Sequence, residues 1–119
     1  MLNNNFGLHL ILDLSECNTA RINNIDTIYN FLLNLPKTMN MTLMTLPYVV
    51  KWMDKGAKTE GISGFVMIAE SHISIHTYPD DKRIYADVFS CRNFHVRRTI
   101  DWFLRTFEAK KYEKQIMKR

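Results

Sequence analysis

The chain has 119 residues, of which 46% are hydrophobic and 24% are charged. This length predicts one compact globular domain, because two domains would each be too small to bury an adequate core. The sequence contains no run of about 18 apolar residues, which excludes a membrane-spanning helix of ordinary length. The N-terminus, Met1-Leu-Asn-Asn-Asn5, also lacks the basic and apolar regions of a signal peptide. We therefore expect a cytoplasmic protein without a membrane partner.

The formal net charge of +4 is concentrated near the C-terminus. Residues 97–119 contain eight Lys or Arg and three Asp or Glu, whereas the rest of the chain has a net charge of −1. Such a run usually forms the solvated face of a helix, so we do not expect a nucleic-acid partner. A basic nucleic-acid-binding module that uses residues 97–119 remains the alternative from another functional class.

The chain has two cysteines, Cys17 and Cys91, and neither belongs to a Cys-x-x-Cys pair or a Cys/His cluster. In a reducing compartment a structural disulfide between them is not expected, so both are interpreted as free thiols. The spacing also predicts no metal site, because structural and catalytic zinc sites draw their ligands from such clusters.

The first half of the chain predicts a strand, a helix and a second strand. Leucines alternate with other residues over 8–14, which is the period of a strand. Apolar residues recur at helical spacing over 25–35, after Asn23 and Asn24, either of which can cap a helix, and Pro36 is expected to end it. A second strand is predicted at 41–46.

The second half predicts three more strands and a final helix. After a polar loop at 55–61, the apolar run 65–69 indicates a buried strand, and 72–76 alternates as a further strand. A turn at 79–82 precedes another alternating strand at 84–91, and the helical stripe runs from Val96 to Phe107. Short connections between consecutive strands favour antiparallel pairing. The predicted class is α+β, a two-layer sandwich whose mainly antiparallel sheet carries its helices on one face.

The step Glu70-Ser71-His72 stands out because it joins two strand-like segments without the Gly, Asn, Asp or Pro that a tight turn normally needs. By itself this step could be a surface turn that happens to contain a serine. A local rule broken without structural gain is nevertheless a place to look for function.

The residues around this step resemble a known family. The stretch Gly61-Ile-Ser-Gly-Phe-Val-Met-Ile-Ala-Glu-Ser-His-Ile-Ser-Ile-His-Thr-Tyr-Pro-Asp80, followed by Tyr85-Ala-Asp-Val-Phe-Ser-Cys91, is similar to the core of the prokaryotic S-adenosylmethionine decarboxylases. Residues 7–14 resemble the first strand of that family. The close match covers roughly a third of the chain, and the order of elements agrees over nearly all of it.

The resemblance implies that the chain is a proenzyme. In this family the serine hydroxyl, here of Ser71, attacks the carbonyl of the preceding residue, here Glu70, and the chain is cut into residues 1–70 and 71–119. The new N-terminus carries a pyruvoyl group made from the serine. Its ketone forms a Schiff base with the substrate amine, which gives the electrons released by decarboxylation a place to go.

The resemblance also implies further roles. His76 matches the histidine that removes the α-proton during processing, and Ser63 matches the serine that steadies the tetrahedral intermediate. Cys91 matches the cysteine that returns a proton to the substrate. Without the motif, His76 would be interpreted as an ordinary strand histidine, Ser63 as a loop serine, and Cys91 as a small buried hydrophobe, which is our interpretation of Cys17.

Strand geometry adds an expectation about assembly. If Ser71 and His76 lie along one extended strand, five residues separate them by roughly 16 Å, whereas a general base must lie within about 3 Å of its proton. Either the chain bends sharply between them, or the histidine that serves Ser71 belongs to another subunit. We therefore assign Ser71 and Cys91 to one protomer of a homodimer and Ser63 and His76 to its partner, in agreement with the paired sites of the family. The same spacing puts His72 and His76 roughly 13 Å apart, which disfavours a metal site.

The match is weaker in the substrate pocket. Ala57 stands where the family usually has an aromatic side chain that stacks on adenine, Tyr78 stands for a Trp, and Asp80 stands for a Glu associated with the ribose. Trp52, Tyr48 or Tyr78 could supply the missing ring. The expected substrate is S-adenosylmethionine, whose decarboxylated product donates aminopropyl groups for spermidine. The alternative is the same pyruvoyl chemistry on a smaller amino acid such as ornithine or arginine.

Overall fold

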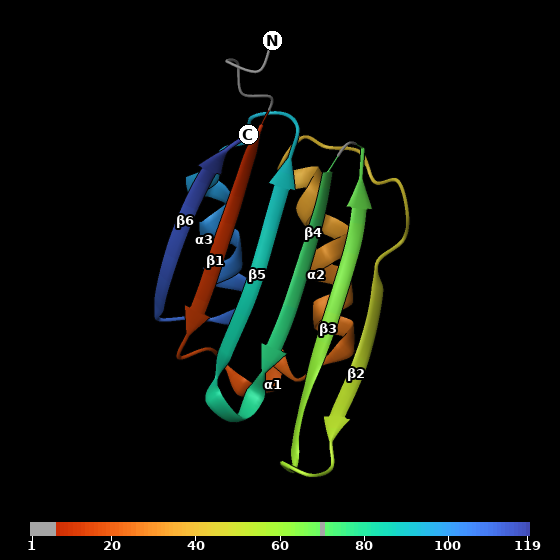
Figure 1. Ribbon diagram of the computed structural model, residues 1–119, viewed down its shortest axis with the longest axis vertical. Coiled ribbons are helices and arrows are strands. Elements are labelled where there is room, and N and C mark those ends of the chain that lie inside the picture. Colours follow the sequence, from red (N-terminus) through yellow and green to blue (C-terminus); the bar gives the residue numbers. More distant parts are fainter. Residues whose placement is uncertain (1–6, 70) are drawn as a thin grey trace.

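The computed structural model describes residues 7–69 and 71–119 as a sheet with its helices on one face. Six strands follow the order β2-β3-β4-β5-β1-β6, and every neighbouring pair is antiparallel (Figure 1). The elements in chain order are β1 Leu8–Ser15, α1 Thr19–Ile22, α2 Ile25–Thr38, β2 Tyr48–Asp54, β3 Thr59–Ile68, β4 Ser71–Tyr78, the 3-10 turn η1 Pro79–Asp81, β5 Arg83–Ser90, α3 Val96–Phe107 and β6 Lys111–Lys118. The predicted α+β class with two layers is confirmed.

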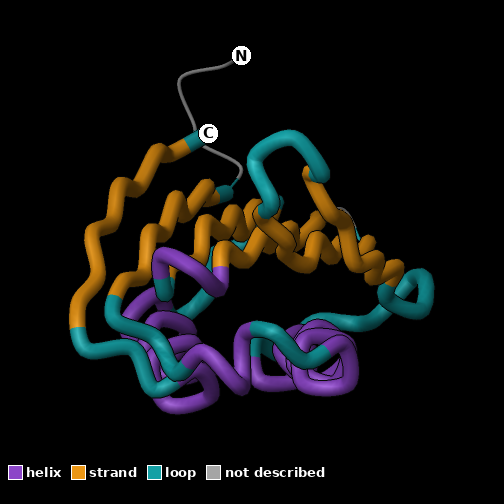
Figure 2. Tube along the Cα trace, turned by 90° about the horizontal axis from the view of Figure 1, so that it is seen from below, coloured by secondary structure: helices purple, strands orange, loops and turns teal. Residues whose placement is uncertain are grey.

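The core lies between the helices and one face of the sheet. Leu10, Leu12 and Leu14 of β1 point to this side and are fully buried, because alternate strand residues face the same way. Phe31 of α2 and Phe103 of α3 meet above the sheet with their ring centroids 4.7 Å apart. The helices therefore bury one face, and no helix of the described residues covers the other, which we call the open face (Figure 2). None of the described helices is long and apolar enough to cross a membrane.

The first predicted helix continues beyond Pro36. The α2 helix ends at Thr38, so Pro36 lies in its last turn and is buried. A proline at this place removes a single backbone donor, and the backbone N–H of Met39 still closes the helix by donating to Leu35 O at 3.1 Å. Because Asn24 accepts a hydrogen bond from Thr27 N, the N-terminus of α2 agrees with the expected cap.

The strand predicted at 41–46 is wrong. This segment makes only an isolated bridge between Leu43 and Ile68, and the strand of this region is β2, at Tyr48–Asp54. The backbone N–H of Ala69 donates to Thr42 O at 3.0 Å, so the segment instead ties down the residues that follow β3. The strand predicted at 65–69 is part of β3, but Phe65 and Met67 point to the open face and are exposed in this chain.

The predicted helix from Val96 to Phe107 is confirmed as α3, but the basic segment does not continue as a helix beyond it. After α3 ends at Phe107, the chain forms β6, whose residues are all exposed and which pairs with β1. The charged side chains suit an exposed edge strand, where they hinder pairing with another sheet. The basic segment 97–119 therefore does not form the single helical face on which the nucleic-acid alternative depends.

Candidate active site

Ser71 and Cys91 meet at one end of the sheet. Ser71 is the first residue of β4 and lies directly opposite Ser90, the last residue of β5. The backbone N–H of Cys91 donates a hydrogen bond to Ser71 Oγ at 3.1 Å, and the Ser71 side chain is buried on the helix side of the sheet. Cys91 is half-buried and its thiol is free. The structure thus places the hydroxyl of Ser71 against the backbone of Cys91 within one chain.

Ser63 and His76 form a second pair on the open face. They are register partners on β3 and β4, and Ser63 Oγ lies 2.8 Å from His76 Nδ1. This hydrogen bond fixes the orientation of an imidazole that is otherwise exposed. The structure therefore has two separate contacts, Ser71 with Cys91 and Ser63 with His76.

Within one chain, the two pairs do not form a single site. Ser71 and His76 lie on the same continuous strand β4, as the distance argument assumed, and their side chains point to opposite faces of the sheet. Five residues of strand correspond to roughly 16 Å, so the imidazole cannot reach Ser71 Oγ of its own chain. Glu70, the other predicted cleavage residue, lies outside the described residues.

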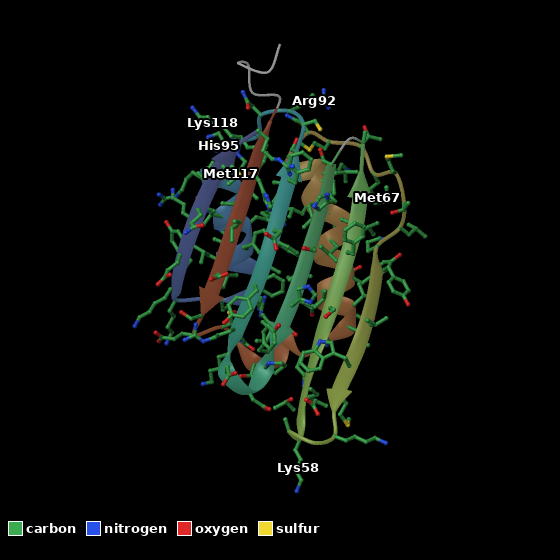
Figure 3. The ribbon with its side chains drawn as sticks, viewed as in Figure 1. Lys58, Met67, Arg92, His95, Met117 and Lys118 are labelled. Carbon is green, nitrogen blue, oxygen red and sulfur yellow. The ribbon has the colours of Figure 1, made fainter. Side chains whose placement is uncertain are left out.

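The predicted substrate-binding residues gather at the far end of the sheet. Trp52 of β2 and Tyr78 of β4 contact each other edge to face, with ring centroids 5.9 Å apart. The Trp52 ring lies across Gly61, where a Cβ atom would collide with it, so glycine is needed for this close approach. Ala57 is exposed in the turn between β2 and β3, near Lys58 at the tip of this hairpin (Figure 3).

Asp80 lines a cavity of about 380 Å³ beside this hairpin. The other residues of this cavity are Met53, Lys55, Lys58, Thr59 and Glu60. Because Lys55 and Lys58 face the same space as Asp80, the cavity already holds two cations beside its two carboxylates. Asp80 follows the end of β4, whereas Ser71 begins this strand, so the two residues lie at opposite ends of it within one chain.

Aromatic and titratable side chains occupy the centre of the open face. His72 stacks on Phe65 with centroids 5.8 Å apart and also contacts Phe89. Partial burial, reinforced by the nearby His9, lowers the pKa of His72 from its ordinary value, although Asp87 opposes this shift. His9 Nε2 and Asp87 Oδ1 lie 3.1 Å apart. A neutral His72 among aromatic rings makes this part of the face suited to burial.

Cys17 differs from Cys91 in its surroundings. Its side chain belongs to the core, and burial raises the pKa of its thiol to about 11. At neutral pH it therefore stays protonated, in agreement with its interpretation as a small buried hydrophobe. Among residues 7–69 and 71–119, no group of three or more His, Cys, Asp or Glu side chains is arranged to hold a metal ion.

Sequence reasoning missed Ser90, which lies beside Ser71 and is completely buried. Its signal was present in the strand alternation, because Ile84, Ala86, Val88 and Ser90 share the helix side of β5. A hydroxyl at the end of an otherwise apolar row must find hydrogen-bond partners when it is buried.

Comparison with known proteins identifies the family of the chain. The profile of the family described as S-adenosylmethionine decarboxylase matches residues 8–119. An S-adenosylmethionine decarboxylase proenzyme from Clostridium botulinum is 33% identical over 114 residues, covering 94% of this chain and 93% of the relative. A proenzyme of the same name from Thermodesulfovibrio yellowstonii is 31% identical over 105 residues, covering 87% of this chain and 73% of the relative.

A solved structure shows the same fold. The crystal structure of the adenosylmethionine decarboxylase from Aquifex aeolicus superimposes with a TM-score of 0.76 at 25% identity, covering 98% of this chain and 92% of that chain. The family profile spans β1 to the last residue of the chain and includes both residue pairs of the candidate site. The chain therefore belongs to the S-adenosylmethionine decarboxylase family.

Proposed function

We propose that the chain is made as a proenzyme, cuts itself between Glu70 and Ser71, and uses the resulting pyruvoyl group to decarboxylate S-adenosylmethionine. Family membership supports the reaction class, a carboxy-lyase whose product donates aminopropyl groups for spermidine synthesis. The observation that carries the proposal is the hydrogen bond from Cys91 N–H to Ser71 Oγ, because it holds the attacking oxygen beside the residue proposed to act later on the substrate. The proposed setting is the cytoplasm, where both cysteines stay reduced.

Maturation begins with Ser71 Oγ as the nucleophile. The oxygen attacks the carbonyl carbon of Glu70, the C–N bond breaks, and the nitrogen takes up a proton, which leaves an ester. Removal of the Ser71 α-proton then forms a Cα=Cβ double bond while the Cβ–Oγ electron pair leaves with the Glu70 carboxylate. Water converts the remaining dehydroalanine into the pyruvoyl group and releases ammonia.

The partner subunit supplies the remaining groups in this proposal. His76 removes the α-proton, and its hydrogen bond with Ser63 keeps the imidazole oriented. The Ser63 hydroxyl also stabilises the tetrahedral intermediate. After maturation, the pyruvoyl ketone supplies the electron sink for decarboxylation. Cys91, which stays beside residue 71, returns the proton to the substrate α-carbon.

The open face supports the proposed homodimer. Its exposed apolar side chains have between 39% and 71% of their surface accessible, and they are Tyr48, Val50, Phe65, Met67, Tyr85 and Met117. Figure 3 shows Met67 and Met117 on different sides of this face, so the apolar surface is spread across the sheet. Several exposed apolar side chains on one sheet face favour an interaction site there. A second copy laid on it would cover the neutral His72 and bring a foreign Ser63–His76 pair to the sheet.

The proposal is tested first on the unmodified protein. Mass spectrometry of purified protein should find two fragments, residues 1–70 and 71–119, the second with a pyruvoyl group in place of its N-terminal serine. The smaller fragment should resist Edman degradation, because its N-terminus has no amine. A single intact chain after long incubation, with Ser71 unmodified, would refute self-processing.

The substrate is expected to be S-adenosylmethionine. The Trp52–Tyr78 pair offers aromatic surface for adenine where Ala57 offers none. A smaller substrate such as ornithine or arginine would need a carboxylate for its distal cation, and Asp80 is the candidate. Lys55 and Lys58 line the same cavity as Asp80, and their positive charges disfavour a cation there. Trp52→Ala should raise KM for S-adenosylmethionine roughly 10- to 100-fold, with a smaller effect on kcat, because stacking on one base contributes about 1–3 kcal/mol.

The matched control for this variant is Trp102→Ala, which removes the other tryptophan, on the outer face of α3. It should leave KM unchanged. Release of carbon dioxide should be measured with S-adenosylmethionine, ornithine and arginine in turn. Turnover of ornithine or arginine, abolished by Asp80→Asn, with none of S-adenosylmethionine, would instead establish the smaller amino acid as substrate.

A further inference from the structure

Ser90 is a buried hydroxyl to which the proposed chemistry assigns no role. It has no exposed surface and lies directly opposite Ser71 on the helix side of the sheet. Its Oγ accepts a hydrogen bond from Arg92 N at 3.0 Å and donates to Met41 Sδ at 3.5 Å. Both hydrogen-bonding directions of the hydroxyl are therefore used, and its orientation is fixed.

These contacts hold the turn that leaves β5. The hydrogen bond between Ser90 Oγ and Arg92 N spans Cys91, and so it sets the direction in which Cys91 N–H points. That N–H donates to Ser71 Oγ at 3.1 Å. Arg92 lies at the end of the sheet opposite the Lys58 hairpin (Figure 3), where β5 ends and β4 begins.

Gly7 holds the same turn from its other side. A Cβ atom on Gly7 would collide with Ser90 O and would lie 2.7 Å from Cys91 Cα, so only glycine allows the chain to pass this close. The Ser90–Cys91 peptide is thus fixed by a side-chain hydrogen bond, by a close backbone contact and by the pairing of Ser90 with Leu8 of β1.

We propose that Ser90 is a positioning residue for self-cleavage, which aims the backbone N–H of Cys91 at Ser71 Oγ. This inference rests on the proposed function. The N–H stabilises negative charge wherever it develops on that oxygen. Charge develops there when Oγ loses its proton to attack the carbonyl carbon. It develops again when the Cβ–Oγ bond breaks and its electron pair leaves with the Glu70 carboxylate. Cys91 therefore contributes through its backbone before its thiol acts on substrate.

The test is the rate of self-cleavage in chains made by cell-free synthesis and quenched at intervals. Ser90→Ala removes the hydroxyl without adding volume and should slow cleavage about tenfold or more, since removing one donor at such an oxygen costs about 100- to 1,000-fold when the loss is direct. In the Ser90→Thr and Ser90→Val variants the new side chains have the same shape, but only threonine keeps the hydroxyl. Cleavage should remain within about threefold of wild type for Thr and fall for Val.

Thr99→Val serves as the control for buried hydroxyls in general. Thr99 is also buried, on α3, where its hydroxyl donates to His95 O at 3.0 Å. The Thr99→Val variant should have a lower unfolding temperature than the wild type but should be cleaved at about the wild-type rate. If Ser90→Val cuts as fast as Ser90→Thr, or if cleavage in all these variants simply follows the unfolding temperature, Ser90 has no positioning role. Failure of the wild-type chain to cleave would refute the proposed function instead, so the two outcomes are distinguishable.

Discussion

Ser71→Ala is expected to remain a single chain of 119 residues and to have no decarboxylase activity. The change removes the only oxygen that the proposed mechanism can use for attack, and it leaves Cys91 N–H without the acceptor that it has at 3.1 Å. The fold should survive, because alanine fits the buried position at the start of β4 and keeps the pairing with Ser90. Denaturing electrophoresis and intact mass should show one species at every time point.

The matched control is Ser74→Ala, which removes another hydroxyl from the same strand. Ser74 lies three residues along β4 and on the open face. This variant should be cut at the wild-type position and should decarboxylate its substrate. Cleavage of Ser71→Ala before residue 71 would show that another group, or a contaminating protease, breaks the chain, and the pyruvoyl mechanism would then fail for this protein.

Mixing Ser71→Ala chains with His76→Ala chains should restore cleavage that neither variant shows alone. In a mixed dimer, one site combines Ser71 of the His76→Ala chain with His76 of the Ser71→Ala chain, so this site is complete. The other site lacks both groups. Random pairing of equal amounts therefore allows about half of the His76→Ala chains to be cut, and no Ser71→Ala chains. The small fragment should have the mass expected for alanine at residue 76.

A second mixture provides the control. Ser63→Ala and His76→Ala alter two residues that contact each other on the same protomer, so every site in their mixed dimer lacks one group. This pair should give no more cleavage than the two variants give separately. If heterodimers of Ser71→Ala and His76→Ala form but neither chain is cut, the assignment of His76 to the partner subunit is wrong.

The elements with strong periodicity could be predicted from the sequence. The leucine row of β1 and the apolar stripe of α3 appear where expected, because each buries one face against the core. By contrast, β6 shows no buried face at all, since every one of its residues is exposed and only pairing with β1 holds it as a strand. Pairing between strands that are far apart in the sequence is a tertiary contact, so the local periodicity of residues 111–118 does not predict it.

The candidate site divides in the same way. The resemblance to the family points to Ser63, Ser71, His76 and Cys91, and Ser71 and His76 lie on one strand, as the distance argument assumed. The hydrogen bond between Cys91 N–H and Ser71 Oγ could not be predicted, because it depends on how the ends of β4 and β5 are aligned. The role of Ser90 likewise emerges only from its neighbours.

The strand order has a consequence for a chain that is cut before Ser71. The first fragment contributes β1, which lies between β5 and β6 of the second fragment, so the pieces are interleaved in one sheet (Figure 1). Such pieces cannot separate without opening three ladders, β3–β4, β5–β1 and β1–β6, and the sheet must be assembled before the cut. Once the mature protein is unfolded, its return becomes a second-order reaction between two molecules. The refolding rate of the uncut chain is therefore independent of protein concentration, whereas that of the mature protein falls when the protein is diluted.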